Sequence, residues 1–285
     1  MILSRFQNWL ATEPMSKQPS ETTPRSAPGT ANAPDRRLNA VHDYLDRHVS
    51  RSDRGVEIGA FDRPILKRPE WNVLYADVYS TERLLELARN NPRRHVDRVV
   101  EVDLPLGEQT LAKAMAGRGI DFVFGSHVFE HIPNLLGFLR DVAVELNDGG
   151  RVIGAFPDRR YTFDIDRPRT TLGQLVDRDR QNLSKPDPSA VFDHFYHFKP
   201  VKAGQVWHSG NDHGVGRSFT VAQAIEKSRN SLDEYVDAHC NIFGDDEFEA
   251  IAAEFVNLGI PLRLDSIFPT SRPMNEFFFC LRKSD

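Results

Sequence analysis

Short apolar runs alternate with segments of helical periodicity along the first half of this 285-residue chain, and this alternation constrains the fold more than any other feature. Five runs predict strands at residues 56–59, 73–78, 99–103, 121–126 and 151–156. Helical patterns precede or separate them at residues 38–45, 81–89, 109–116 and 134–146. Strands that alternate with helices are typical of a parallel sheet covered on both faces.

The C-terminal part predicts two more strands and a helix. A helix is expected at residues 246–258, followed by strands at 261–268 and 275–281 around a turn at 269–273. A short turn makes two strands antiparallel neighbours, and the run Phe277, Phe278 and Phe279 is expected in the sheet core. We therefore predict an α/β fold: a Rossmann-like, doubly wound, mostly parallel seven-stranded sheet with an antiparallel last strand and an insertion after strand 5.

Two segments depart from the strand–helix pattern. Residues 12–36 are rich in Pro, Ser and Thr and almost lack large apolar groups, so we expect residues 1–36 to be disordered. Residues 157–219 are polar, aromatic and rich in histidine, with a helix expected near residues 172–181. We interpret this stretch as an insertion that covers the acceptor site within one domain spanning residues 37–285.

Composition narrows the function classes. Lys+Arg number 36 and Asp+Glu number 41, so a net charge of −5 gives no general attraction to nucleic acid, and no nucleic-acid partner is expected. The two cysteines suggest no disulfide framework. We find no apolar stretch long enough to span a bilayer and no signal-peptide pattern, so the expected location is the cytoplasm.

Polar residues gather where the predicted strands end, which is where doubly wound sheets bind ligands. Gly59 would let backbone approach a ligand without a Cβ. Asp77, 18 residues after Gly59, is placed to accept both hydroxyls of an adenosine ribose, and Asp103 to reach an adenine amino group. One such acid alone is more often a helix cap, but Glu57, Asp77 and Asp103 at three consecutive strand ends favour a site. The chain lacks G-x-G-x-x-G there, which argues against a pyrophosphate cradle.

These motifs resemble those of class I S-adenosylmethionine-dependent methyltransferases. Residues 56–60 are similar to the family's first motif, Asp77 to its ribose-binding acid, residues 121–133 to its fourth motif with the Glu130–His131 pair, and residues 146–152 to its fifth-strand entry. The first motif here has a single glycine, a departure from the fuller version. The resemblance implies that S-adenosyl-L-methionine binds to Glu57, Gly59, Ala60, Asp77, Val78, Asp103, Leu104, Ser126 and His127, with Glu57 and Gly59 on the methionine part.

Methyl transfer to a hydroxyl needs alignment of donor and acceptor and a group that removes the proton. His131, just past the fourth strand, is the leading candidate base, although packing against the next helix is an equally good interpretation. Asp158 and His239 are further catalytic candidates, and no metal ligand is assigned. Arg159, Arg160, Tyr161 and Asp237 are candidate substrate-binding residues. A reserve of bases or ligands comprises His194, His197, His208, His213, His239, Asp158, Asp164 and Asp237.

A narrower resemblance concerns context. Residues 156–164, 167–171 and 235–240 look like a bacterial subgroup whose members accompany glycosyltransferases of surface-polysaccharide synthesis. It implies a methyl acceptor that is an oxygen, less readily a nitrogen, of a sugar or glycan precursor, and an association with glycosyltransferases. Alternatives are a small-molecule or lipid methyltransferase and a non-catalytic scaffold of the same fold.

A different enzyme class competes for one motif. His127-Val128-Phe129-Glu130-His131 fits H-x-x-E-H, in which two histidines on one helix face bind zinc and the glutamate acts as base. A zinc-dependent hydrolase of this kind needs a helix through the motif. Here the motif follows a predicted strand and meets Pro133, so we favour the methyltransferase interpretation.

Overall fold

The computed structural model describes residues 36–107, 109–210 and 214–284. The segment expected to be disordered, residues 1–36, lies outside the described residues except for Arg36. One sheet in the order β3-β2-β1-β4-β5-β7-β6 forms the centre of the chain. Its strands are β1 Gly55–Ile58, β2 Val73–Asp77, β3 Leu104–Pro105, β4 Ile120–Ser126, β5 Leu146–Pro157, β6 Leu262–Phe268 and β7 Glu276–Lys283.

The topology confirms the predicted fold class. Strands β3, β2, β1, β4 and β5 pair in parallel, whereas β7 lies antiparallel between β5 and β6. The chain adds β2 and β3 on one side of β1 and then adds β4 and β5 on the opposite side of β1, so the direction of winding reverses between β1 and β4. This reversal makes the carboxyl ends of β1 and β4 the expected ligand site.

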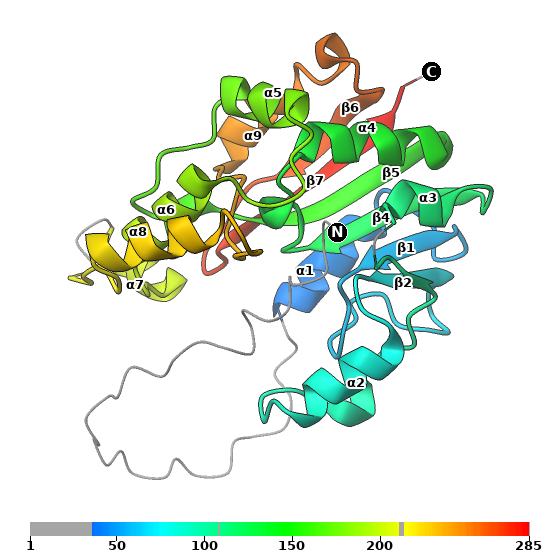
Figure 1. Ribbon diagram of the computed structural model, residues 1–285. Coiled ribbons are helices and arrows are strands. Elements are labelled where there is room, and N and C mark those ends of the chain that lie inside the picture. Colours follow the sequence, from blue (N-terminus) through cyan, green and yellow to red (C-terminus); the bar gives the residue numbers. More distant parts are fainter. Residues whose placement is uncertain (1–35, 108, 211–213, 285) are drawn as a thin grey trace.

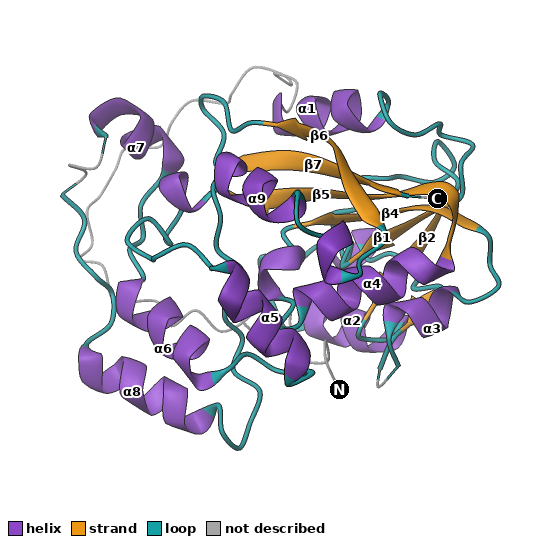
Figure 2. Ribbon diagram, turned by 90° about the horizontal axis from the view of Figure 1, so that it is seen from above, coloured by secondary structure: helices purple, strands orange, loops and turns teal. Residues whose placement is uncertain are grey.

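Helices cover both faces of the sheet (Figures 1 and 2). Side chains of α1 pack against one face, and side chains of α3, α4 and α9 pack against the other. The α-helices are α1 Arg36–Leu45, α2 Thr81–Arg89, α3 Leu111–Met115, α4 Leu135–Glu145, α5 Leu172–Arg180, α6 Pro188–His197, α7 Ala203–Ser209, α8 Val221–Asn230 and α9 Asp245–Ala252.

Strand β4 illustrates why the central runs are apolar throughout. Phe122 and Phe124 contribute to the core beneath α1, while Val123 between them contributes to the core beneath α3 and α4. Successive side chains of a strand point to opposite faces, so a strand buried on both faces needs apolar residues at every position. Phe277 and Phe279 on β7 are buried with Val123, as expected.

The predicted third strand at residues 99–103 is wrong. The chain forms a 3-10 turn at Val96–Arg98, and pairing with β2 begins only at Leu104. Val99 and Val102 instead pack against the cluster that contains Leu84 of α2. A strand of only two paired residues leaves no recognisable apolar pattern in the sequence. The apolar run just before it has the pattern of a strand, although its valines pack near α2.

The segment after β5 is more helical than its composition suggested. The helix expected near residues 172–181 is present as α5, but α6 and α7 were not predicted. Val191 and Phe195 of α6 pack on Ala224 of α8, so this unit extends beyond residue 219. Figures 1 and 2 place α6 and α8 side by side at one end of the sheet.

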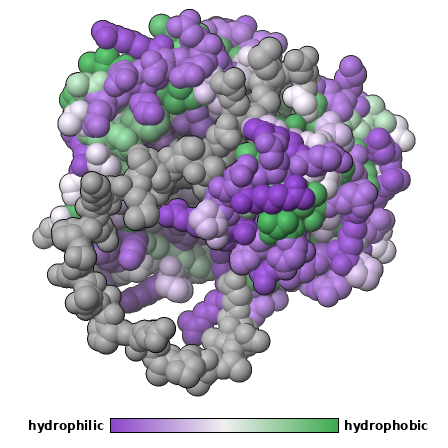
Figure 3. Space-filling view, turned by 60° about the horizontal axis from the view of Figure 1, so that its bottom comes forward, coloured by the Kyte–Doolittle hydropathy of each residue, from purple (hydrophilic) through white to green (hydrophobic). Residues whose placement is uncertain are grey.

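Among the described residues, no helix is long and apolar enough to cross a lipid bilayer. On the face shown in Figure 3, hydrophilic residues predominate and apolar residues form only small areas.

Candidate functional site

Three of the predicted cofactor residues meet at the carboxyl edge of the sheet. Ile58 pairs with Ala76 of β2 and with Gly125 of β4. The next residue on each strand, Gly59, Asp77 and Ser126, therefore lies at the same level of three adjacent strands, at the point where the strand order reverses.

Gly59 and Asp77 are each held in place by backbone hydrogen bonds at this edge. Gly59 has φ +71°, a left-handed conformation that glycine adopts at little cost, and its N–H donates to the Ala76 carbonyl. The Asp77 carboxylate is buried at the strand end and accepts a hydrogen bond from the Tyr79 N–H. Ala60 and Val78, which follow these two residues, are buried.

Glu57 does not point to the cofactor position, contrary to the implied contact with methionine. Its two carboxylate oxygens accept hydrogen bonds from the N–H groups of Ile65 and Leu66, each at 2.9 Å. Burial dominates and raises the pKa of Glu57 to about 7, although these two hydrogen bonds oppose the increase. Glu57 therefore fixes the loop that follows Gly59.

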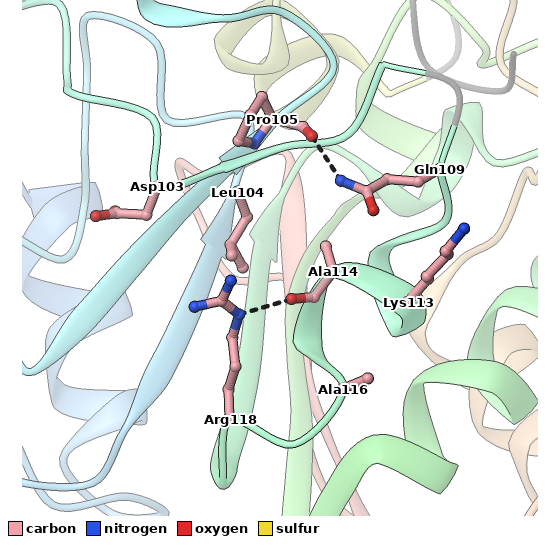
Figure 4. A pocket seen from close by; sticks show the side chains of 8 residues that line it. All are labelled: Asp103, Leu104, Pro105, Gln109, Lys113, Ala114, Ala116 and Arg118. Atoms are coloured by element: carbon pink, nitrogen blue, oxygen red, sulfur yellow. Dashed lines mark hydrogen bonds between the residues drawn. The ribbon is translucent and has the colours of Figure 1, made fainter.

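Asp103 and Leu104 also differ from their predicted place. Asp103 precedes β3 and lies beside Tyr75, two residues before the carboxyl end of β2, where its carboxylate accepts from the Tyr75 N–H and pairs with Arg68. It borders a cavity of about 250 Å³ at the sheet edge, and in Figure 4 its carboxylate points away from Gln109. Leu104 is buried in the core. Asp103 thus lies before its strand and not at the strand end from which adenine binding was predicted.

Ser126 and His127 belong to a charged network that joins α1 to β7. The Arg37 guanidinium donates to Ser126 Oγ at 2.7 Å and to both carboxylate oxygens of Glu276 at 2.6 and 2.8 Å. His127 Nε2 lies 2.7 Å from Glu276 Oε2, and the backbone of His127 is left-handed, with φ 54°. Such a conformation is costly for a residue with a Cβ, and it turns the chain sharply at the end of β4.

A cavity of about 560 Å³ opens directly beside His127. It is lined by residues that follow β4, by the end of β5, and by residues 161–163 and 201–203 of the segment after β5. The lining residues are His127, Glu130, His131, Pro157, Tyr161, Thr162, Phe163, Val201, Lys202, Ala203, His239 and Asn275. The volume is typical of a small-molecule site.

Two histidines in this cavity are each held by an aspartate. His131 Nδ1 lies 2.9 Å from Asp237 Oδ1, and His239 Nδ1 lies 2.6 Å from Asp164 Oδ2. The two rings meet edge to face with centroids 4.7 Å apart. Burial opposes protonation of His131, but the charges of Asp237 and Glu130 outweigh it and raise the pKa of His131.

Glu130 is the most unusual group of the site. Its side chain is 1% exposed, and neither carboxylate oxygen accepts a hydrogen bond from the described residues. Glu130 Oε1 lies 3.7 Å from His127 Nδ1 and 3.7 Å from His131 Nε2. A buried carboxylate without hydrogen bonds is costly unless a ligand or cation completes it.

Three predicted residues after β5 serve the scaffold and do not line the cavity. Asp158 is fully buried; its carboxylate caps the 3-10 turn Arg159–Tyr161 and pairs with Arg160. This geometry contradicts a role for Asp158 as the base. Arg159 forms a two-pronged ion pair with Glu247, and Arg160 also contacts Asp245. Both guanidinium groups are thus engaged in holding α9, which contradicts the predicted clamp on substrate.

Of the remaining aromatic and histidine candidates, one lines the cavity and the others that the structure describes do not. Tyr161 lines the cavity and stacks on Trp207 with centroids 4.0 Å apart. His194 is buried behind His239, whose backbone N–H donates to His194 Nδ1, and burial lowers the pKa of His194 well below its usual range. His197 and His208 do not line the cavity, and His213 lies outside the described residues.

The H-x-x-E-H interpretation is wrong in its geometry. His127 ends a strand with a left-handed backbone, and Phe129–His131 forms one 3-10 turn, so the two histidines do not share a face of an α-helix. His127 Nε2 is directed to Glu276 instead. Glu276 and Arg37 carry no local sequence signal for this network, because their partners lie up to 239 positions away.

Comparisons with known proteins find solved structures that are only weakly similar to this chain in fold and sequence. No protein-family model and no curated protein matches the chain. Solved structures similar to it include a Rhodobacter sphaeroides protein provisionally described as a Zn-dependent alcohol dehydrogenase, with 18% identity, TM-score 0.45 and coverage of 89% of this chain and 92% of that one. They also include an S-adenosylmethionine-dependent methyltransferase from Clostridium acetobutylicum, with 11% identity, TM-score 0.45 and coverage of 87% and 91%. A methyltransferase from Pyrococcus furiosus has 10% identity, TM-score 0.41 and coverage of 87% and 83%. Similarities this low support no inference about function.

Proposed function

We propose that this protein is an S-adenosylmethionine-dependent methyltransferase that transfers a methyl group to an oxygen, less readily a nitrogen, of a sugar or glycan precursor. The observation that carries the proposal is that Gly59 and the buried Asp77 carboxylate lie at the switch point, level with Ser126. The residue after Ser126, His127, lines the cavity that also contains Glu130 and His131. The strand order is also the one that the resemblance to class I methyltransferases implies.

The donor half of the site fits the cofactor. S-adenosylmethionine, when bound, supplies a methyl group on a positively charged sulfur. Asp77 is placed to accept the ribose hydroxyls, and Gly59 allows backbone to approach without a Cβ. Ser126 and His127 would border the sulfur end, with Glu276 holding His127 in place.

The acceptor half suits a hydroxyl-rich molecule. Thr162, Lys202 and Asn275 offer hydrogen-bonding groups, and Tyr161 and Phe163 offer aromatic faces. Apolar surface from Pro157, Val201 and Ala203 also lines the cavity, so the transfer assay decides between a sugar and a lipid acceptor.

The reaction requires that the acceptor oxygen lose its proton as it attacks the methyl carbon. The O–CH₃ bond forms while the S–CH₃ bond breaks, and S-adenosylhomocysteine leaves with the sulfur electron pair. The cluster of Glu130, His131 and His239 is the group of titratable side chains in the cavity that would act on this proton. Asp237 and Asp164 orient the two rings.

A transfer assay tests the proposal. Purified protein is incubated with methyl-labelled S-adenosylmethionine and a panel of nucleotide sugars, oligosaccharides and fatty acids. We expect label in a sugar-containing product and none in the fatty acids. Transfer to fatty acids would refute the acceptor class. Bound donor with no transfer to any acceptor class would favour the scaffold alternative.

A further inference from the structure

We propose that Glu130, His131 and His239 form a binding site for one divalent transition-metal cation, with the open coordination positions facing the acceptor cavity. One ligand atom of each residue lies within 4.8 Å of those of the other two, and all three residues are buried. Two imidazoles and one carboxylate are a common ligand set for zinc and other first-row divalent ions.

The geometry of the ligands is close to that of a loaded site. Metal–ligand bonds of about 2.1 Å in a tetrahedral arrangement separate the ligand atoms by about 3.4 Å. Glu130 Oε1 and His131 Nε2 are 3.7 Å apart, so a cation between them needs only a small contraction.

The outer shell around the two histidines is also of the kind that metal sites use. Metal-bound histidines characteristically donate their other ring N–H to a carboxylate, which fixes the ring and its tautomer. Asp237 contacts Nδ1 of His131, and Asp164 contacts Nδ1 of His239. Both rings thereby present Nε2 for coordination.

The carboxylate supplies an independent indication of a missing partner. Glu130 is buried, and neither of its side-chain oxygens accepts a hydrogen bond from the described residues. A bound cation would provide the interaction partner that the Glu130 carboxylate oxygens lack among the described residues. The backbone around it is held firmly: the Cys240 and Asn241 N–H groups donate to the Glu130 carbonyl, which locks the segment of His239 to that of His131.

The cation gives the site a specific role in the proposed reaction, and this role rests on the proposed function. A hydroxyl of the acceptor that coordinates the cation has a lower pKa, its proton passes to water, and the resulting alkoxide attacks the methyl carbon. His131 would then be a ligand, and the cation, in place of the imidazole, would activate the acceptor oxygen.

Zinc binding to the full chain tests the site directly. Protein is treated with a chelator, dialysed and titrated with ZnCl₂ by calorimetry, and Co²⁺ replaces Zn²⁺ for an absorption spectrum of the coordinated ion. We expect one Zn²⁺ per chain. Glu130→Gln should weaken binding by more than roughly a hundredfold, because a lost ligand costs more than a lost outer partner.

Two further variants secure the interpretation. Asp237→Asn keeps all three ligands and should weaken Zn²⁺ binding by roughly ten- to a hundredfold through the orientation of His131. Asp265→Asn is the matched control, because His48, Asp265 and Cys280 form the other group of compatible spacing among the described residues; it should bind Zn²⁺ as the wild type does. Circular dichroism reports whether each variant is folded.

The outcomes separate this inference from the proposed function. Absence of Zn²⁺ binding to the wild type, unchanged binding in Glu130→Gln, or loss of binding in Asp265→Asn would overturn the metal site. S-adenosylhomocysteine binding is measured on the same wild-type sample. Zn²⁺ binding without it would leave the metal site standing and refute the methyltransferase proposal.

Discussion

Replacement of Glu276 by glutamine removes one charge from the network that ties α1 and His127 to the sheet. The carboxylate is 1% exposed and contacts the Arg37 guanidinium and His127 Nε2 at 2.6 to 2.8 Å. Burial alone would raise the pKa of Glu276, but the hydrogen bonds and charges of His127 and Arg37 lower it to about 2.

The pKa shift sets the expected size of the effect. A decrease from 4.5 to about 2 corresponds to about 3 kcal/mol of folding free energy. The side chains of Arg37 and His127 are 41% and 37% exposed, so solvent screening reduces this figure. We expect Glu276→Gln to lower the free energy of unfolding by about 2 kcal/mol at pH 7.

The pH dependence gives the prediction its direction. The folded-state pKa lies below the unfolded value, so the stabilisation is fully present above pH 4.5 and is lost as the pH falls toward 2. Urea denaturation of both proteins at a series of pH values should therefore show a difference in unfolding free energy that shrinks below pH 4.5.

The exposed ion pair between Arg83 and Glu86 on α2 provides a matched control. Glu86→Gln removes one side of an exposed ion pair with Arg83 on α2 and should change stability little at any pH. If the difference between wild type and Glu276→Gln stayed constant down to the lowest pH at which both fold, the effect would come from packing and not from charge.

Two other predictions concern the core and the loop after β1. Gly154→Ala should lower the free energy of unfolding, measured by urea denaturation, by about 3 kcal/mol, because the added Cβ would lie 2.4 Å from the Phe279 ring. In the control Gly204→Ala the added Cβ has no atom within 4 Å, so the free energy of unfolding should not fall. Glu57 has a folded-state pKa of about 7, above its unfolded value, so its contribution is present below pH 4.5 and is lost as the pH rises to 7. Glu57→Gln should remove that decline from the stability profile, and an unaltered decline would contradict the assignment.

The central strands could be predicted because burial on both faces leaves a continuous apolar run in the sequence. Strand β4 carries Phe122, Val123 and Phe124 for this reason. Strand β3 could not be located, because only two of its residues pair and the valines before it pack elsewhere. Helix α6 was missed because its aromatic residues pack on α8 and on one another, away from the sheet.

The residues proposed to hold the donor follow from sequence more readily than those proposed to act on the acceptor. Gly59 and Asp77 lie at strand ends, so a correct prediction of the strands also locates these two residues. The contacts of His131 with Asp237 and of His239 with Asp164 join positions 106 and 75 residues apart, and no local pattern signals them. Several predicted residues of this region proved to be scaffold, because charged groups near a site also pair with one another to hold the loops.

Calorimetry with S-adenosylhomocysteine tests whether the donor binds at the ends of β1 and β2. We expect binding to the wild type that Asp77→Ala abolishes and that Asp103→Ala leaves intact, because Asp103 is paired with Arg68 before β3. No binding to a folded wild type, or equal binding by wild type and Asp77→Ala, would contradict the placement of the donor at the ends of β1 and β2.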